Sequence, residues 1–276
     1  MKLFRVYFFA IIFVLTISGV ARAEESGTVR LPVVMYHQIS KNAEKWNDYV
    51  LSLQEFRSDM EYLKSRGWES ISVDELIAWQ RGEFIMPEKP MMITFDDGSY
   101  GTVAYAEPVL KEMGFKGVAA LIGSVCEEFS KNGETDPELS SLSWGAARDM
   151  VNRGVIEVQC HSWDMHSNQW TVGCARRYGE SAEAYRRRLS TDLSKFIVQC
   201  KKNNLATTYS IAYPYGAFND ATTEIVKDMG FVAAFTCTEE INVLTGAMEE
   251  LYYLGRFNRP HGISSENFFK KWENNY

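Results

Sequence analysis

The 276-residue sequence lacks the motifs of several common classes of protein. No Gly-x-Gly-x-x-Gly or Walker-type loop follows an expected strand, which argues against nucleotide binding. No Cys-x-x-Cys pair is present, so a structural zinc ribbon is not expected. Cysteine is scarce, and the odd number of five leaves at least one thiol free in any disulfide pattern. The formal net charge of −7 offers no basic surface overall, so we expect no nucleic-acid partner.

Long apolar runs are also rare, and the one that stands out lies at the N-terminus. Two basic residues precede an apolar run over residues 6–17, and small residues occupy both cleavage positions of Ala-Arg-Ala at 21–23. This layout is typical of a secretory signal peptide, and the run is short for a membrane span, although an uncleaved anchor is the alternative. We therefore predict a signal peptide over 1–23 and a mature chain over 24–276 without an integral membrane domain. The mature chain is expected in the periplasm, on the cell surface or outside the cell.

The mature chain alternates short apolar segments with segments of helical periodicity, which is the order of an α/β fold. Capping boxes at Ser52 with Glu55 and at Ser72 with Glu75 predict two helix starts. Residues 124–142 are expected to form a long polar loop. About six or seven strand–helix units in roughly 250 residues favour a distorted (β/α) barrel of about seven strands, in a single domain. Strands are expected over 31–36, 90–95, 117–122, 155–160, 210–213, 232–236 and 252–257.

Polar side chains with chemical potential directly follow several of these strands. His37 follows the first strand, and Asp96 and Asp97 follow the second. His161 follows a later strand, with His166 close behind. In a barrel the C-terminal ends of the strands share one rim, where functional residues gather. Three of the four histidines and an adjacent aspartate pair are therefore expected at one rim.

Two histidines and one carboxylate suit a divalent transition metal that keeps open positions for water and substrate. His161 and His166 are five residues apart, and on a loop both imidazoles can turn toward one centre. Neighbouring residues at a strand end point to opposite sides, so Asp96 and Asp97 can act separately as base and ligand. Considered alone, the aspartates are equally consistent with a helix cap and a solvated side chain. The two histidines alone are also consistent with surface or core packing.

Three segments together resemble the first three motifs of the polysaccharide deacetylases, the NodB-homology group or carbohydrate esterase family four. They are Thr-Phe-Asp-Asp-Gly at 94–98, His-Ser at 161–162 with His166, and Tyr-Pro-Tyr-Gly at 213–216. The segments occur in the family's order, and the resemblance covers residues 30–260. It implies a NodB-like barrel and a metal-dependent hydrolase.

The resemblance also implies a role for each matching position. Asp96 would be the general base that activates the attacking water. Asp97, His161 and His166 would bind the metal, with zinc expected first and cobalt or nickel as alternatives. The third motif would line the sugar pocket through Pro214, Tyr215 and Gly216, and the backbone N–H of Tyr215 would help to hold the oxyanion.

The sequence departs from the family pattern at the position that usually orients the base. Most members have an arginine two residues before the proline of the third motif, where this chain has Ala212. Arg256 is a candidate replacement as the partner of Asp96, with an ordinary salt bridge or a surface position as the alternative.

A second departure concerns the general acid. The C-terminal Leu-x-His of the family has no clear copy, and His261 is the only C-terminal histidine, in surroundings that do not match. The Tyr36-His37 pair is similar to the permuted branch that includes the biofilm poly-N-acetylglucosamine deacetylases, in which an N-terminal Tyr-His supplies the acid. His37 is therefore the predicted acid, because a histidine pKa lies near neutrality. A packing role at the strand end is its alternative.

The predicted substrate is a polysaccharide that contains N-acetylglucosamine. Trp163, between the two predicted ligands, is the best-placed aromatic platform for a sugar ring, ahead of Trp144 and Trp170, although tryptophans at such positions often only pack. Poly-N-acetylglucosamine is the first substrate expected, with peptidoglycan, chitin oligomers and xylan as alternatives. A small-molecule metal amidase and a catalytically inactive glycan-binding relative are the rival functions, and no protein partner is assigned.

Overall fold

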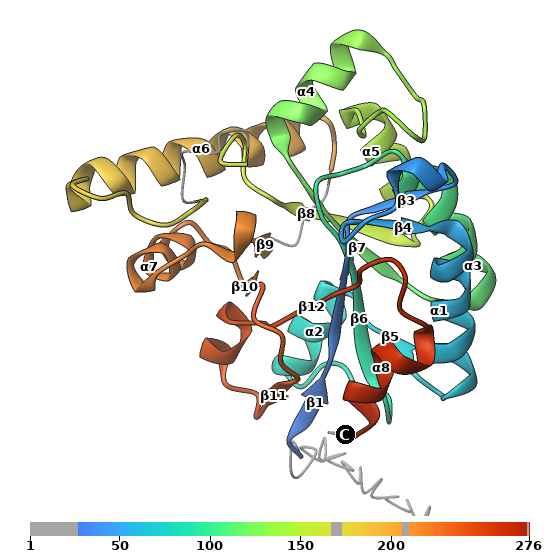
Figure 1. Cartoon of the computed structure of the whole chain (residues 1–276). Coiled ribbons are helices and arrows are strands. Elements are labelled where there is room, and N and C mark those ends of the chain that lie inside the picture. Colours follow the sequence, from blue (N-terminus) through green and yellow to red (C-terminus); the bar gives the residue numbers. More distant parts are fainter. Residues whose placement is uncertain (1–26, 167–172, 206–209, 275) are drawn as a thin grey trace, which may run out of the picture.

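A curved sheet of parallel strands forms the centre of the protein (Figure 1). The computed structural model describes residues 27–166, 173–205, 210–274 and 276, so the predicted signal peptide over 1–23 lies outside the described residues. Seven strands follow the order β10-β9-β8-β7-β6-β2-β12, and the short β5 also pairs with β6. The strands are β2 (Val33–Tyr36), β5 (Glu69–Ser70), β6 (Pro90–Phe95), β7 (Gly117–Leu121), β8 (Ile156–Cys160), β9 (Ser210–Ala212), β10 (Ala233–Phe235) and β12 (Phe257–Asn258).

The sheet is a half-barrel, which confirms the predicted distorted (β/α) barrel. All of its pairings are parallel, and β10 and β12 form its two ends, so the strands that the structure describes do not close into a full ring. The predicted strand over 252–257 is largely wrong, because β12 shares only Phe257 with it. Tyr252 ends a 3₁₀ helix (Met248–Tyr252), and Leu254 forms only an isolated bridge with Phe235. Two small sheets flank the barrel, one of β1 (Val29–Leu31) with β11 (Asn242–Leu244) and one of β3 (Gln38–Ser40) with β4 (Val50–Ser52).

Helices cover the outside of the sheet. In Figure 1, α1, α3 and α5 lie on one side of the barrel, and α6 and α7 lie on the other. Both predicted capping boxes are confirmed, because Ser52 and Ser72 each accept the N–H of the glutamate three residues later. No helix in the described part of the chain is long and apolar enough to cross a membrane. The helices are α1 (Leu53–Ser65), α2 (Val73–Gln80), α3 (Glu107–Met113), α4 (Gly123–Asn132), α5 (Trp144–Asn152), α6 (Ala182–Lys202), α7 (Asp220–Asp228) and α8 (Ser265–Glu273).

The predicted polar loop over 124–142 is wrong in its first half, where α4 is found instead. No side chain caps the start of this helix, so the usual sequence signal for a helix start is missing. Its polar residues cover the solvent side, while Cys126 is buried. Contacts with α5 and α6 therefore stabilise a helix that its own sequence does not predict.

The central strand β6 explains why the site lies where it does. All six of its residues are buried, as expected for a parallel strand that is covered on both faces. Ile93 and Phe95 pack in one hydrophobic cluster, whereas Met92 packs in the other, on the opposite face of the sheet. The strand therefore holds the two residues that follow it, Asp96 and Asp97, at the C-terminal edge of a rigid core.

Glu157 on β8 provides a test of the fold, because its carboxyl is partly buried beside the start of α2. Burial raises the pKa of Glu157 from 4.5 to about 7, although its Oε1 accepts the Val73 N–H at 2.7 Å. Between these two pH values the unfolded chain has released this proton and the folded chain keeps it. Stability therefore falls as the pH rises through this window, and the loss is complete above the folded pKa.

We expect Glu157→Gln to remove this pH dependence, since a glutamine does not ionise. As the pH rises from about 4.5 to about 8, the free energy of unfolding of the unsubstituted protein should fall by on the order of 3 kcal/mol relative to that of the variant. Urea unfolding at several pH values measures this difference. A difference that stays constant with pH would contradict the assignment.

Candidate active site

The C-terminal ends of the parallel strands surround one pocket of about 660 Å³. His37 follows β2, Asp96 and Asp97 follow β6, and His161 follows β8, so the barrel brings them to one rim as the sequence predicted. The described residues that line the pocket are Met35, His37, Tyr49, Asp96, Asp97, His161, His166, Tyr215, Cys237, Glu239 and Asn258.

Asp97, His161 and His166 form a cluster of potential metal ligands. Oδ1 of Asp97 lies 3.4 Å from Nε2 of each histidine, and the three ligand atoms all lie within 4.8 Å of one another. This Oδ1 is buried and accepts no hydrogen bond. A buried carboxylate oxygen without a donor, facing two imidazole nitrogens, fits the ligand set of a divalent transition metal.

A hydrogen bond to the backbone fixes the orientation of His161. Its Nδ1 lies 2.8 Å from the carbonyl oxygen of Ala212, which can only accept, so Nδ1 carries the proton. In the neutral ring Nε2 then keeps its lone pair toward Asp97, as metal-binding histidines require. Ala212, the position at which the usual arginine is missing, therefore contributes through its backbone.

The backbone around the cluster is unusual, and this conformation aims the side chains. Asp97, Ser162 and Tyr215 have φ angles of 68°, 69° and 59°, in the left-handed region that residues other than glycine rarely adopt. Such strain is commonly found at functional sites. The turn at Asp97 directs its carboxylate toward the histidines, whereas the Asp96 carboxylate faces Arg256.

Asp96 is buried and paired with Arg256 through both carboxylate oxygens. Nη1 of Arg256 donates to Oδ1 of Asp96 at 2.7 Å, and Nη2 donates to Oδ2 at 2.9 Å. The Arg256 side chain is 0% exposed and the Asp96 side chain is 3% exposed. Burial raises the pKa of Asp96, but the charge and hydrogen bonds of Arg256, together with the nearby His161 and His37, outweigh burial and hold the pKa well below its usual value. Asp96 is therefore an anion in the folded protein, and Arg256 is the buried partner that the sequence suggested.

His37 faces the same pocket and has an unused nitrogen. Its Nδ1 is buried without a hydrogen-bond partner, and its ring packs against Tyr49 with the centroids 5.0 Å apart. Burial lowers the pKa of His37, and the nearby Asp96 and Asp97 charges partly oppose this effect. The imidazole is thus available to exchange a proton with a bound molecule.

The third motif contributes one residue to the pocket. Tyr215 lines it, stacks on His166 at 4.3 Å, and donates its hydroxyl to the His166 carbonyl at 2.7 Å. Pro214 and Gly216 are not among the described lining residues. Gly216 instead lies against Cys237, where an added Cβ would meet the Cys237 Cβ at 2.8 Å. These two residues shape the turn that presents Tyr215.

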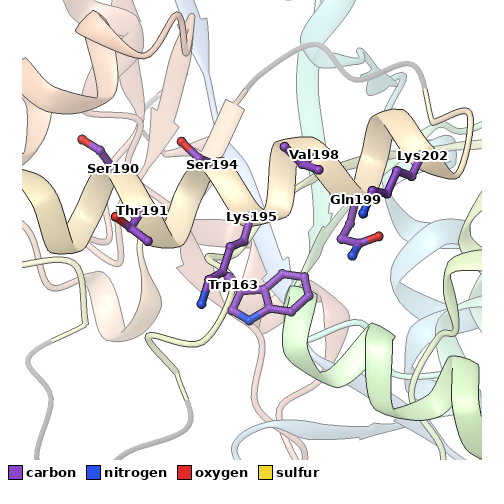
Figure 2. A pocket seen from close by; sticks show the side chains of 8 residues that line it. All are labelled: Trp163, Ser190, Thr191, Ser194, Lys195, Val198, Gln199 and Lys202. Carbon is purple, nitrogen blue, oxygen red and sulfur yellow. The ribbon is translucent and has the colours of Figure 1, made fainter.

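Trp163 lies outside this pocket, in a neighbouring groove along α6 (Figure 2). Its indole covers Gly123, where an added Cβ would come within 2.6 Å of the ring, so it packs between elements as well as facing the groove. Trp144 is buried, and Trp170 lies outside the described residues. His261 is not among the described lining residues either, and its Nδ1 lies 2.6 Å from a carboxylate oxygen of Glu55.

Several lining residues were not predicted from the sequence. Asn258 ends β12, so the rule that function gathers after strands indicates its position. Tyr49, Cys237 and Glu239 lie in loops without a motif, and only the folded chain brings them to the pocket. Met35 lies in β2, where its apolar side chain indicates a position in the hydrophobic core.

Comparison with known proteins finds a family and similar folds. The family model described as polysaccharide deacetylase matches residues 85–234. A poly-beta-1,6-N-acetyl-D-glucosamine N-deacetylase from Staphylococcus aureus is 26% identical over 228 residues, which are 82% of this chain and 73% of that protein. The enzyme of the same name from Escherichia coli is 23% identical over 222 residues. The match covers 74% of this chain and 33% of the E. coli enzyme, so the chain spans about a third of that enzyme's length.

Solved structures give the same fold at low sequence identity. A de-N-acetylase from Aggregatibacter actinomycetemcomitans superposes with a TM-score of 0.73 at 23% identity, over 89% of this chain and 99% of that one. IcaB from Ammonifex degensii has a TM-score of 0.67 at 24% identity, over 86% of this chain and 93% of that one. Both support the half-barrel architecture described above.

Proposed function

The chain belongs to the polysaccharide deacetylase family, as its three motifs indicated, and we propose that it removes N-acetyl groups from a polysaccharide containing N-acetylglucosamine. The observation that carries this proposal is the joint placement of Asp96, Asp97, His37, His161 and His166 around one pocket. Poly-β-1,6-N-acetylglucosamine is the proposed substrate, because the named relatives from S. aureus and E. coli act on it. We propose further that the chain is exported, as the predicted signal peptide requires.

Asp97, His161 and His166 would hold a divalent metal, with zinc as the first choice and cobalt or nickel as alternatives. When bound, such a metal supplies a Lewis acid that polarises the acetyl carbonyl and makes water more acidic. The other catalytic groups in the proposed reaction are side chains and backbone groups of the protein.

Hydrolysis of an acetamide forms one C–O bond, breaks one C–N bond and moves two protons. Asp96, ionised and held by Arg256, would accept a proton from the attacking water. The backbone N–H of Tyr215 would donate to the oxyanion as the carbonyl becomes tetrahedral. His37 would give a proton to the departing sugar amine, so that acetate and a free amine leave the site.

Acetate release tests the proposed function directly. Purified protein is stripped of metal with a chelator, refilled with zinc, cobalt or nickel, and mixed with β-1,6-linked N-acetylglucosamine oligomers. We expect no acetate from the stripped protein and recovery of activity with metal. Activity that persists without metal would contradict the metal role, and stoichiometric metal binding without acetate release would contradict the deacetylase function.

His37→Ala is expected to lower kcat about 100-fold while the protein binds metal normally, since general acid catalysis typically contributes this much or more. The alkaline limb of the pH–rate profile should flatten, because the variant has no His37 imidazole to lose its proton as the pH rises. His261→Ala serves as the matched control and should retain full activity, as its ring pairs with Glu55 and is not among the described residues that line the pocket. Equal losses in both variants would remove the case for His37.

A further inference from the structure

Tyr49 is an exposed aromatic residue on the wall of the site pocket, and the proposed chemistry does not use it. It is 59% exposed, and its ring meets the His37 ring edge to face at an interplanar angle of 75°. Single exposed aromatic residues are common on protein surfaces, so exposure alone assigns no role. The position of Tyr49 beside His37 and the way its backbone is held are more informative.

The turn that carries Tyr49 is fixed from several directions. Its N–H donates to Oδ1 of Asn47 at 2.8 Å, and its carbonyl accepts the Gln38 N–H at 3.1 Å. The neighbouring Asp48 carbonyl accepts Nδ2 of Asn258 at 3.0 Å, which ties the turn to the end of β12. A ring presented on a backbone held in this way loses little conformational freedom when a ligand covers it.

A second exposed tyrosine lies on the wall of the same pocket. Tyr215 is 55% exposed and stacks on His166, whereas Tyr49 packs on His37. The two tyrosine rings therefore lie beside different histidines of the pocket. The pocket volume of about 660 Å³ is within the range of sites for ligands much larger than an acetamide, so it has room for sugar rings next to the reacting one.

We propose that Tyr49 is a sugar-binding platform that holds the pyranose ring next to the residue being deacetylated, so that the site prefers oligomers to single sugars. One face of a pyranose carries C–H groups, which pack well on the electron-rich face of an aromatic ring. This inference rests on the proposed function and names the recognition of a second sugar at the same site. Tyr49 would act through binding, and the chemical step would remain with Asp96 and His37.

Steady-state kinetics of Tyr49 variants test the platform. For a β-1,6-linked N-acetylglucosamine pentamer, we expect Tyr49→Ala to raise KM about tenfold and to leave kcat within about twofold. Tyr49→Phe should keep the KM of the unsubstituted protein, because it retains the ring. Hydrolysis of 4-nitrophenyl acetate, which has no sugar, should be unchanged in both variants. Tyr253→Ala is the matched control, since Tyr253 is also exposed, at 42%, but is not among the described residues that line the pocket.

An unchanged pentamer KM in Tyr49→Ala would overturn the inference, as would an equal loss on pentamer and ester, which would show that His37 had moved. Calorimetric binding of the pentamer to the metal-stripped protein, with and without Tyr49→Ala, tests the platform without turnover. If the unsubstituted protein releases no acetate, the proposed function fails, while a tenfold weaker Kd on loss of Tyr49 still supports the platform. A Kd that does not depend on Tyr49 overturns the platform alone.

Discussion

Asp96→Asn is expected to lower kcat/KM about 1,000-fold, within the range that a general base contributes. Asparagine has nearly the same shape as aspartate, but it cannot accept a proton from water. In the folded protein the Arg256 charge holds the pKa of Asp96 well below its usual value, so the carboxylate is ionised at any working pH. Acetate release from N-acetylglucosamine oligomers measures the loss.

The same substitution should also destabilise the fold, because it leaves a buried guanidinium without a counter-charge. Arg256 is 0% exposed, and breaking a buried pair of this kind costs about 3–5 kcal/mol. The second buried pair provides a matched control, since Arg259 donates to both oxygens of Asp59 at 2.8 and 2.9 Å. Asp59→Asn should lose similar stability and keep kcat/KM within about threefold in the folded protein.

Urea unfolding and activity, measured on the same samples, separate the two effects. An Asp96→Asn variant that retains more than about a tenth of the activity would contradict the role of Asp96 as base. If Asp59→Asn lost activity to the same degree, the loss in Asp96→Asn would reflect stability alone.

His161→Ala is expected to abolish stoichiometric metal binding. The substitution removes one of three clustered ligand atoms and also the hydrogen bond that ties the ring to the Ala212 carbonyl. Outer partners of metal ligands already contribute about 10- to 100-fold to affinity, so loss of a ligand should weaken zinc binding by more than about 100-fold. Acetate release should fall in parallel.

Metal content after dialysis, and calorimetric titration with zinc, measure this prediction. His166→Ala should behave similarly, with a smaller cost to stability, because His166 is less buried than His161. His261→Ala should retain one metal per chain. Full zinc stoichiometry in His161→Ala would place the metal elsewhere and would contradict the proposed ligand set.

The two adjacent aspartates have different hydrogen-bond surroundings. Asp96 has both oxygens occupied by Arg256, whereas Asp97 has an Oδ1 that accepts no hydrogen bond and faces two histidines. This difference follows from the left-handed backbone at Asp97, which turns its side chain away from the direction of the strand. One carboxylate is thus held as a fixed anion and the other is left open to a ligand.

Much of the site was accessible from the sequence because it obeys a local rule. A strand that is buried on both faces appears as an unbroken apolar run, and the residues that follow its C-terminal end lie at the rim of the barrel. This rule alone predicts from the sequence that His37, Asp96 and His161 lie together. The capping boxes at Ser52 and Ser72 were equally local, since each bond joins residues three apart.

Where the sequence failed, the missing information was a contact between distant segments. Helix α4 has no capping residue, and it is stabilised by packing on α5 and α6. Trp163 follows a predicted ligand, but its indole turns to Gly123 and the α6 groove, away from the pocket lining. Tyr49 lies in a turn that is held by a distant residue. The carbonyl of Asp48 in this turn accepts a hydrogen bond from Asn258, which lies 210 residues later in the chain.

The sequence by itself determined the barrel architecture, most of the strand ends and the motif residues at its rim, because strand burial and helix capping are encoded within a few neighbouring residues. The tertiary structure decided which side chains complete the site. The Arg256–Asp96 pair joins residues 160 positions apart, and the hydrogen bond between His161 and Ala212 joins residues 51 apart. The sequence suggested Arg256 as a partner of Asp96 but did not distinguish it from a surface arginine, and no motif predicts the bond to Ala212. Both depend on where the barrel brings distant segments together.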